Sequence, residues 1–259
     1  MIKAVFFDID GTLVSFQTHT VPPSTVRALH LLREQGVKVF ISTGRAMRSI
    51  DNLGDLSFDG YVTLNGGICY EGKERIFYRH PIPPSDIEAL LQLLQRRPFP
   101  CGLVTEHAIL HNYINARVEE IYALLNFPTP PVVDLSALNG AAVYQLIAFF
   151  TQAEEAEIMS FLPGCVATRW NPLFTDVVAK GSSKAVGIEQ MAAHFGISVE
   201  EKMAFGDGGN DVAMLRRAGI GVAMGNAEAS VQREADYVTT SVDEDGVWNA
   251  LRHFGLIRL

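Results

Sequence analysis

The chain has 259 residues, of which 48% are apolar and 19% are charged, a composition that is ordinary for a folded globular protein with one large or two modest domains. Its formal net charge is −8, whereas binding to nucleic acid or an anionic membrane requires an excess of basic residues. We therefore exclude both as main partners. The three cysteines are scattered, which suggests neither a disulfide framework nor a zinc site and fits a reducing cytoplasm.

The first predicted element is a buried strand over residues 1–10 that ends in two acids and a glycine. Asp8 and Asp10 stand two residues apart, so on a strand their side chains would face the same way near its carboxyl end. Two close carboxylates resist joint ionisation. The pair is therefore metal-bound, shares a proton, or is merely solvated at the start of a turn, and this stretch alone leaves all three open.

The next part of the chain alternates helices and strands. A proline at the start, apolar residues at helical spacing and a final glycine predict a helix over residues 22–36. We predict strands at 37–42 and 60–67, a helix at 45–54 between them, and a hairpin at 68–79. This order is typical of a parallel sheet that helices cover on both faces.

The pattern changes near residue 80, where three prolines interrupt it. Amphipathic helices are predicted at 86–97 and 116–127, and strands at 101–106, 108–113, 143–150, 165–170 and 174–179. Helices and strands no longer alternate strictly, which favours a separate α+β module.

From residue 180 the alternation returns. Helices are predicted at 182–196, 210–219 and 226–235, and strands at 202–208, 219–225 and 237–241. We therefore expect one doubly wound parallel-sheet domain, residues 1–81 and 180–259, interrupted by an α+β domain of residues 82–179.

No segment resembles a membrane anchor. An acid at residue 8 comes too early for a signal peptide, and the longest apolar run, residues 141–150, is far shorter than the roughly 20 residues that span a bilayer. We expect a soluble cytoplasmic protein.

Polar residues follow the predicted core strands at their carboxyl ends, where open α/β sheets bind ligands. They are Ser42, Thr43, Gly44 and Arg45 after the second strand, Asp207, Asn210 and Asp211 after a later one, and Lys180 where the inserted module rejoins. Each has an ordinary alternative: Thr43 could cap a helix, Asp211 could be a first-turn acid, and Lys180 could be a solvated charge.

Taken together these residues favour one kind of chemistry. Acids at two strand ends form a nest of hard oxygen ligands suited to Mg²⁺, while Thr43, Lys180 and loop amides supply donors for phosphate oxygens. One carboxylate of the opening pair can attack phosphorus and the other can carry protons. The set predicts a phosphoryl-transfer site for a small phosphorylated substrate.

Four stretches, in this order, carry a family resemblance: "DIDGTL" (8–13), "STGR" (42–45), "KGSSK" (180–184) and "GDGGND" (206–211). With a module inserted between the second and the third, the chain resembles the haloacid dehalogenase superfamily. It is most similar to the Cof-type subfamily with a class IIB (C2B) cap, and within it to bacterial sugar-phosphate, or hexose-phosphate, phosphatases. The resemblance implies a Rossmann-like core with an inserted α+β cap.

The resemblance also implies a role for each motif residue. It makes Asp8 the nucleophile that forms an aspartyl-phosphate and Asp10 the general acid and base. The implied metal is Mg²⁺, and the implied ligands are Asp8, the backbone carbonyl of Asp10, and Asp207, with Asp211 in support. The expected phosphate-binding or substrate-binding residues are Thr43, Gly44, Arg45, Lys180 and Asn210.

Two alternatives remain. One is a phosphomutase that uses the same intermediate. The other is a receiver-like phosphorylation switch, in which acids, Thr and Lys also surround a phosphorylated Asp, but the position of Asp8 on the first strand disfavours it. In the cap, we expect about a third of the polar or aromatic residues near predicted strand ends to contact the substrate. These cap candidates are Glu106, His107, His111, Asn112, Arg169, Trp170 and Asn171.

Overall fold

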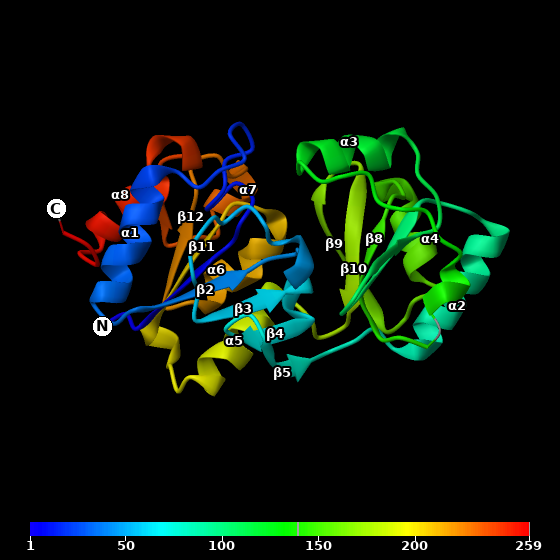
Figure 1. Ribbon diagram of the computed structural model, residues 1–259, viewed down its shortest axis with the longest axis horizontal. Helices are drawn as coiled ribbons and strands as arrows, with labels where there is room; N and C mark the ends of the chain where they lie inside the picture. The colour runs from blue at the N-terminus through cyan, green and yellow to red at the C-terminus, as the bar shows by residue number, and fades with distance from the viewer. Residues whose placement is uncertain (139, 259) are drawn as a thin grey trace. The chain divides into compact units, whose positions relative to one another are not determined.

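The computed structural model describes residues 1–138 and 140–258. The chain forms two compact units, which we call the core unit and the insert (Figure 1). The core unit combines Met1–Tyr78 with the chain from Ser183 onward, and the insert is Arg79–Ser182. The sequence analysis placed the insert at 82–179, so the observed unit begins and ends slightly outside that range.

The core unit is built on a sheet that has eight strands within the described residues, in the order β13-β12-β11-β1-β2-β3-β4-β5. From β13 to β3 the strands are parallel, and β4 pairs antiparallel with β3. The strands are β1 (Ala4–Phe7), β2 (Lys38–Ser42), β3 (Gly60–Thr63), β4 (Ile68–Glu71), β5 (Arg75–Arg79), β11 (Lys202–Gly206), β12 (Ile220–Ala223) and β13 (Tyr237–Val238). Phe7 pairs with Ile41 on one side and Phe205 on the other, so these strands end at one edge of the sheet.

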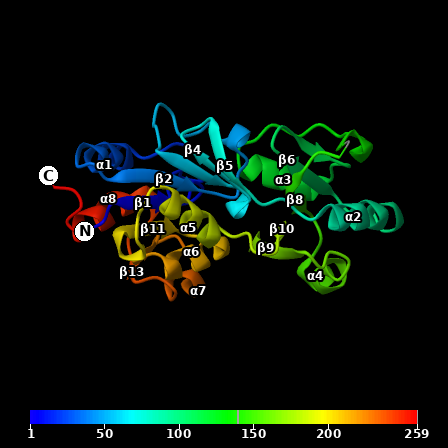
Figure 2. The same ribbon diagram turned by 90° about the horizontal axis from the view of Figure 1, so that it is seen from below.

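Helices cover both faces of this sheet, which is why its inner strands are continuously apolar. The core-unit helices are α1 (Pro23–Glu34), α5 (Lys184–His194), α6 (Val212–Arg217), α7 (Ala229–Gln232) and α8 (Gly246–His253). Figure 2 shows α1 on one side of the strands and α5 and α6 on the other. Phe6 and Phe40 pack with Ile188 and Met191 of α5 and with Met214 of α6. The predicted doubly wound fold is confirmed.

The predicted helix over residues 45–54 is wrong. Only Met47–Ser49 forms a single 3-10 turn there. The Arg45 carbonyl accepts a hydrogen bond from the Leu64 N–H at 3.1 Å, and the Ser49 carbonyl accepts one from the Arg45 guanidinium at 2.9 Å. One carbonyl that a helix would use is thus taken by Leu64, a distant residue, and another by the nearby Arg45 side chain. The predicted helix at 210–219 is also shorter, because it begins at Val212 and ends at Arg217.

The insert is an α+β domain, as predicted. Its sheet runs in the order β7-β6-β8-β10-β9 among the described residues, with antiparallel neighbours. The strands are β6 (Cys101–Thr105), β7 (Ile109–His111), β8 (Val143–Ala148), β9 (Cys165–Asn171) and β10 (Phe174–Ala179), and the helices are α2 (Pro84–Arg96), α3 (Ala116–Leu124) and α4 (Gln152–Met159). Leu90 of α2 and Ile158 of α4 belong to a core with Leu103, Leu146 and Val177 of the sheet.

Two further features bear on the sequence analysis. Cys69, Cys101 and Cys165 are buried free thiols. None of the helices in the described ranges combines the length and the apolar character that crossing a membrane requires.

Candidate active site

The segment after β1 carries the first two acids of the site. The strand ends at Phe7, so Asp8 directly follows it and Asp10 lies in the loop beyond, where the strand had been predicted to continue. The Asp8 N–H donates to the Phe205 carbonyl at 3.0 Å, which fixes the start of this loop against β11. Gly11 adopts φ +82°, and a Cβ there would lie 2.2 Å from Asp207 Oδ2, so only glycine fits this close approach. The two acids do not share one environment.

Asp8 is paired with a buried lysine. Its Oδ1 lies 2.7 Å from Lys184 Nζ, and the same Nζ donates to Asp211 Oδ1 at 2.6 Å. Lys184 is 1% exposed and lies at the start of α5, where the Ser183 hydroxyl caps the helix by accepting from the Val186 N–H. Burial by itself would lower the pKa of Lys184, but the carboxylates of Asp211 and Asp8 outweigh it and raise that pKa. Lys184 therefore stays charged between two acids.

The structure places Lys184 beside Asp8, within the core unit. Lys180 is exposed and belongs to the insert, where its carbonyl accepts a hydrogen bond from His80 Nε2 at 3.0 Å. Both lysines stand in the "KGSSK" motif that the sequence analysis recognised, and the one it expected to bind phosphate was Lys180. The signal that identifies Lys184 is Ser183, a helix cap that sets the following lysine in the first turn of α5.

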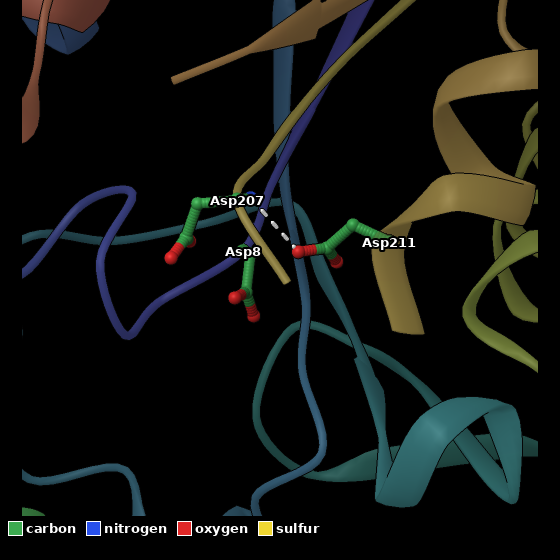
Figure 3. A group of neighbouring side chains, drawn as sticks. All are labelled: Asp8, Asp207 and Asp211. Carbon is green, nitrogen blue, oxygen red and sulfur yellow. Dashed lines mark hydrogen bonds between the residues drawn. The ribbon is translucent and has the colours of Figure 1, made fainter. Parts of the chain in front are cut away.

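Three carboxylates meet at the carboxyl ends of β1 and β11. Oxygens of Asp8, Asp207 and Asp211 all lie within 4.8 Å of one another (Figure 3). Asp207 Oδ1 accepts from the Thr12 hydroxyl at 2.8 Å, and Asp207 Oδ2 lies 3.4 Å from Asn226 Nδ2. Thr12 and Asn226 are site residues that the sequence analysis did not single out.

Asp211 has a supporting position in this cluster. Its Oδ2 accepts from the backbone N–H groups of Asp207 at 3.0 Å, the bond drawn in Figure 3, and of Gly208 at 2.9 Å. Its Oδ1 accepts from Lys184. Asp211 is fully buried, and both of its oxygens are engaged in holding the loop and the lysine. Asp8 and Asp207 retain more capacity for a further ligand.

The cluster holds more negative than positive charge in a buried place. Burial, and then the charge of Asp211, raise the pKa of Asp8 to about 7, although Lys184 opposes them. Burial, together with the charges of Asp8 and Asp211, raises the pKa of Asp207 well above its usual range. One lysine does not balance three carboxylates, so the site favours a bound cation or protons.

Asp10 is bound by a different cation. Arg45 Nε donates to Asp10 Oδ2 at 2.8 Å and Arg45 Nη2 donates to Asp10 Oδ1 at 2.6 Å, a bidentate pair. Arg45 is 8% exposed, and its third guanidinium nitrogen donates to the Ser49 carbonyl. Arg45 was expected to bind phosphate or substrate, and here its guanidinium group is paired with Asp10.

The remaining expected residues lie on loops around the cluster. Thr43 is buried, and its Oγ1 accepts from the Arg45 N–H across Gly44 at 3.1 Å, which leaves its hydroxyl proton available for donation. Asn210 Nδ2 donates to Asn65 Oδ1 at 3.0 Å. Asn65, which lies just after β3, is a further residue that the sequence analysis missed.

Several cap candidates take part in the packing of the insert itself. The Arg169 guanidinium donates to Glu155 Oε2 and to the carbonyls of Phe150 and Phe174. His111 is buried with its Nε2 2.7 Å from the Tyr122 hydroxyl. Asn112, likewise, accepts from the Cys101 N–H and donates to the Phe99 carbonyl. These contacts explain the three side chains without a substrate.

Of the other cap candidates, Glu106 has a partner in the insert and Trp170 is described only in part. Glu106 pairs with Arg79 at 3.2 Å. The side chain of Trp170 lies outside the described residues.

Comparisons with known proteins agree with this geometry. The family model of the haloacid dehalogenase-like hydrolases matches residues 5–251 of this chain. YkrA of Bacillus subtilis, named a putative phosphatase, is 33% identical over 259 residues that cover 99% of each chain.

Solved structures extend the likeness to both units. BT4131, described as a sugar phosphatase of haloacid dehalogenase subclass IIB, is 44% identical with a TM-score of 0.92, covering 98% of this chain and 100% of that one. BT1666 of Bacteroides thetaiotaomicron, described among phosphatases of the same superfamily, is 40% identical with a TM-score of 0.92, covering 99% and 96%. The chain belongs to the haloacid dehalogenase-like hydrolase family, and within that family it is a phosphatase.

Proposed function

We propose that the protein is a Mg²⁺-dependent phosphatase that hydrolyses sugar phosphates, with hexose phosphates preferred, through a phosphoryl intermediate on Asp8. The observation that carries the proposal is the state of the Asp8 carboxylate. Its Oδ1 is neutralised by Lys184, whereas its Oδ2 has no hydrogen-bond donor among the described residues. A buried carboxylate with one oxygen held and the other uncommitted is suited to act as a nucleophile.

The acidic cluster fits a hard divalent cation. All its donors are carboxylate oxygens, which Mg²⁺ prefers, and they lie close together around an excess of negative charge. Asp8 and Asp207 would hold the ion, and Asp211 would support them through the Asp207 and Gly208 amides. When bound, the ion would offset the repulsion between the carboxylates and the incoming phosphate.

Hydrolysis then takes two steps. An Asp8 oxygen forms a bond to phosphorus while the bond from phosphorus to the sugar oxygen breaks, and Asp10 gives a proton to that oxygen. Water next attacks the phosphorus and gives a proton to Asp10, and the bond to Asp8 breaks to release inorganic phosphate. The Arg45 guanidinium group binds both Asp10 oxygens, so these proton transfers require it to release at least one of them.

The donors around Asp8 supply the phosphate site. We assign phosphoryl binding to the Thr43 hydroxyl and to Lys184, which takes the role first expected of Lys180. Asn210 and the backbone at Gly44 line the same edge of the sheet, and Arg45 reaches the substrate when it leaves Asp10.

The sugar assignment comes from the relatives. BT4131 is described as a sugar phosphatase and is 44% identical along nearly the whole of both chains. YcsE of Bacillus subtilis, 28% identical, is named a 5-amino-6-(5-phospho-D-ribitylamino)uracil phosphatase. We extend this substrate class to the present chain.

A steady-state screen of phosphate release tests the proposal. The panel contains hexose phosphates, pentose phosphates, a phosphorylated polyol, nucleotides and phospho-acids, each with Mg²⁺. We expect the highest kcat/KM for hexose phosphates. A tenfold preference for nucleotides or phospho-acids would contradict the sugar assignment. Conversion of one sugar phosphate into an isomer without free phosphate would instead indicate a phosphomutase.

A further inference from the structure

The turn after β3 has a backbone that ordinary side chains rarely adopt. Leu64, Asn65 and Gly66 follow one another with φ of 51°, 51° and 88°. A branched residue such as leucine is an outlier in this left-handed region. Leu64 is 2% exposed and Asn65 is 1% exposed, so the turn is held inside the core unit. Such conformations persist only where the surroundings enforce them, and they often mark functional sites.

Backbone contacts join this turn to the segment that carries Thr43. The Leu64 N–H donates to the Arg45 carbonyl and the Asn65 N–H donates to the Thr43 carbonyl, both at 3.1 Å. The turn therefore fixes the backbone on either side of Gly44.

The turn also packs against the start of α5. A Cβ added at Gly66 would lie 2.1 Å from the Ser183 carbonyl oxygen, so the two backbones touch there. Ser183 is the cap of α5 and the residue before Lys184. The position of the buried lysine is thus tied to the same turn.

The third contact is made by a side chain. Asn65 Oδ1 accepts a hydrogen bond of 3.0 Å from Asn210 Nδ2. Asn210 lies in the 3-10 turn Gly209–Asp211, whose last residue binds Lys184 and the Asp207 amide. One three-residue turn therefore contacts the loops of Thr43, Lys184 and Asn210.

We propose that Asn65 is a positioning residue for phosphate: it holds Asn210, and with it the Gly209–Asp211 turn, in register with Thr43 and Lys184. The inference rests on the proposed function, because it takes these three residues as the phosphate-binding groups. Asn65 acts through Asn210, so loss of the Asn65 side chain should have no further effect once Asn210 has been replaced.

The test measures calorimetric binding of inorganic phosphate in the presence of Mg²⁺, which requires no turnover. Asn65→Gly removes the side chain while glycine keeps the left-handed backbone, so the fold should persist. Asn210→Ala removes the other partner, and the double variant completes a cycle. Asn126→Gly is the matched control, because Asn126 is an exposed asparagine of the insert with φ 54°.

We expect Asn65→Gly and Asn210→Ala each to weaken phosphate binding about five- to tenfold, the order of one hydrogen bond. The double variant should bind about as well as Asn210→Ala alone, and Asn126→Gly should bind like the unsubstituted protein. The inference would be overturned if the loss of phosphate affinity in the double variant equalled the two single-variant losses multiplied together. It would also be overturned if Asn65→Gly bound phosphate as well as the unsubstituted protein, whatever its melting temperature.

Phosphate release assayed on the same samples separates the two claims. If the unsubstituted protein is active and the variants give either contrary result, only the positioning role is refuted. Absence of both phosphate binding and turnover in the unsubstituted protein refutes the proposed function and the inference together.

Discussion

Both units bury charged and polar side chains, but they satisfy them in different ways. In the core unit, Asp8, Asp211 and Lys184 are at most 7% exposed and contact one another, with more acids than bases. In the insert, buried acids accept from uncharged donors: Asp176 from the Gln145 side-chain amide and Asp86 from the Gly164 N–H. The first arrangement carries an excess of negative charge, whereas the second pairs each acid with a neutral donor of the insert. Burial of an acid therefore does not by itself indicate a reactive site, whereas an uncompensated cluster makes a candidate for one.

Chelation of divalent cations should have the largest effect. It should abolish the activity of the core unit and leave the folding of both units unchanged. Chelation by EDTA should abolish phosphate release, because a phosphate dianion would then meet Asp8 and Asp207 with too little positive charge to offset them. The far-ultraviolet circular dichroism should stay unchanged, since the cores of both units are apolar. Turnover that survives complete chelation and is unaffected by added Mg²⁺ would remove the metal from the account.

The two lysines of the "KGSSK" motif offer a sharper test. Lys184→Met leaves Asp8 and Asp211 buried without their partner, so it should lower the free energy of unfolding by about 3–5 kcal/mol. Its kcat/KM should fall at least about a hundredfold, because the same ammonium is assigned to phosphate.

Lys180→Met is the matched control for that change. Lys180 is exposed, so its replacement should change the free energy of unfolding by less than about 0.5 kcal/mol. Urea unfolding and phosphate-release assays of both variants give the comparison. A larger loss of activity from Lys180→Met than from Lys184→Met would reverse the assignment.

The insert should show its own, smaller dependence on pH. Burial lowers the pKa of His111 to about 4, whereas an unfolded histidine titrates near 6.5. Between these values the unfolded state binds more protons, so stability falls as the pH drops from 6.5 to 4, by up to about 3 kcal/mol. Urea unfolding of the unsubstituted protein and of His111→Gln, compared at pH 7 and pH 4.5, isolates this contribution. An unfolding free energy that differs between the two proteins by the same amount at both pH values would contradict it.

Much of this architecture could be predicted because it depends on local patterns. Apolar runs identified the strands of the parallel sheet, and helical spacing identified helices between them. Parallel strands bring their carboxyl ends together, so Asp8 and Asp207 were expected near each other. The family assignment, resting on four ordered motifs, is confirmed by the matches over nearly the whole chain.

Other features depend on contacts between distant residues, which local patterns do not contain. Residues 45–54 were predicted to be helical, but the Arg45 carbonyl accepts from the N–H of the distant Leu64. Leu64 adopts a left-handed conformation in a turn that contacts the distant residues Thr43, Arg45, Ser183 and Asn210. The choice between Lys180 and Lys184 likewise depended on where α5 begins.

The central claim is that Asp8 carries the phosphoryl group. Rapid acid quench with a labelled aryl phosphate tests it most directly, because such a leaving group needs little protonation. Asp10→Asn keeps the nucleophile but lacks the base for the second step, so it should accumulate label on Asp8, and Asp8→Asn should accumulate none. Label on any other residue, or near-normal turnover by Asp8→Asn, would contradict the account.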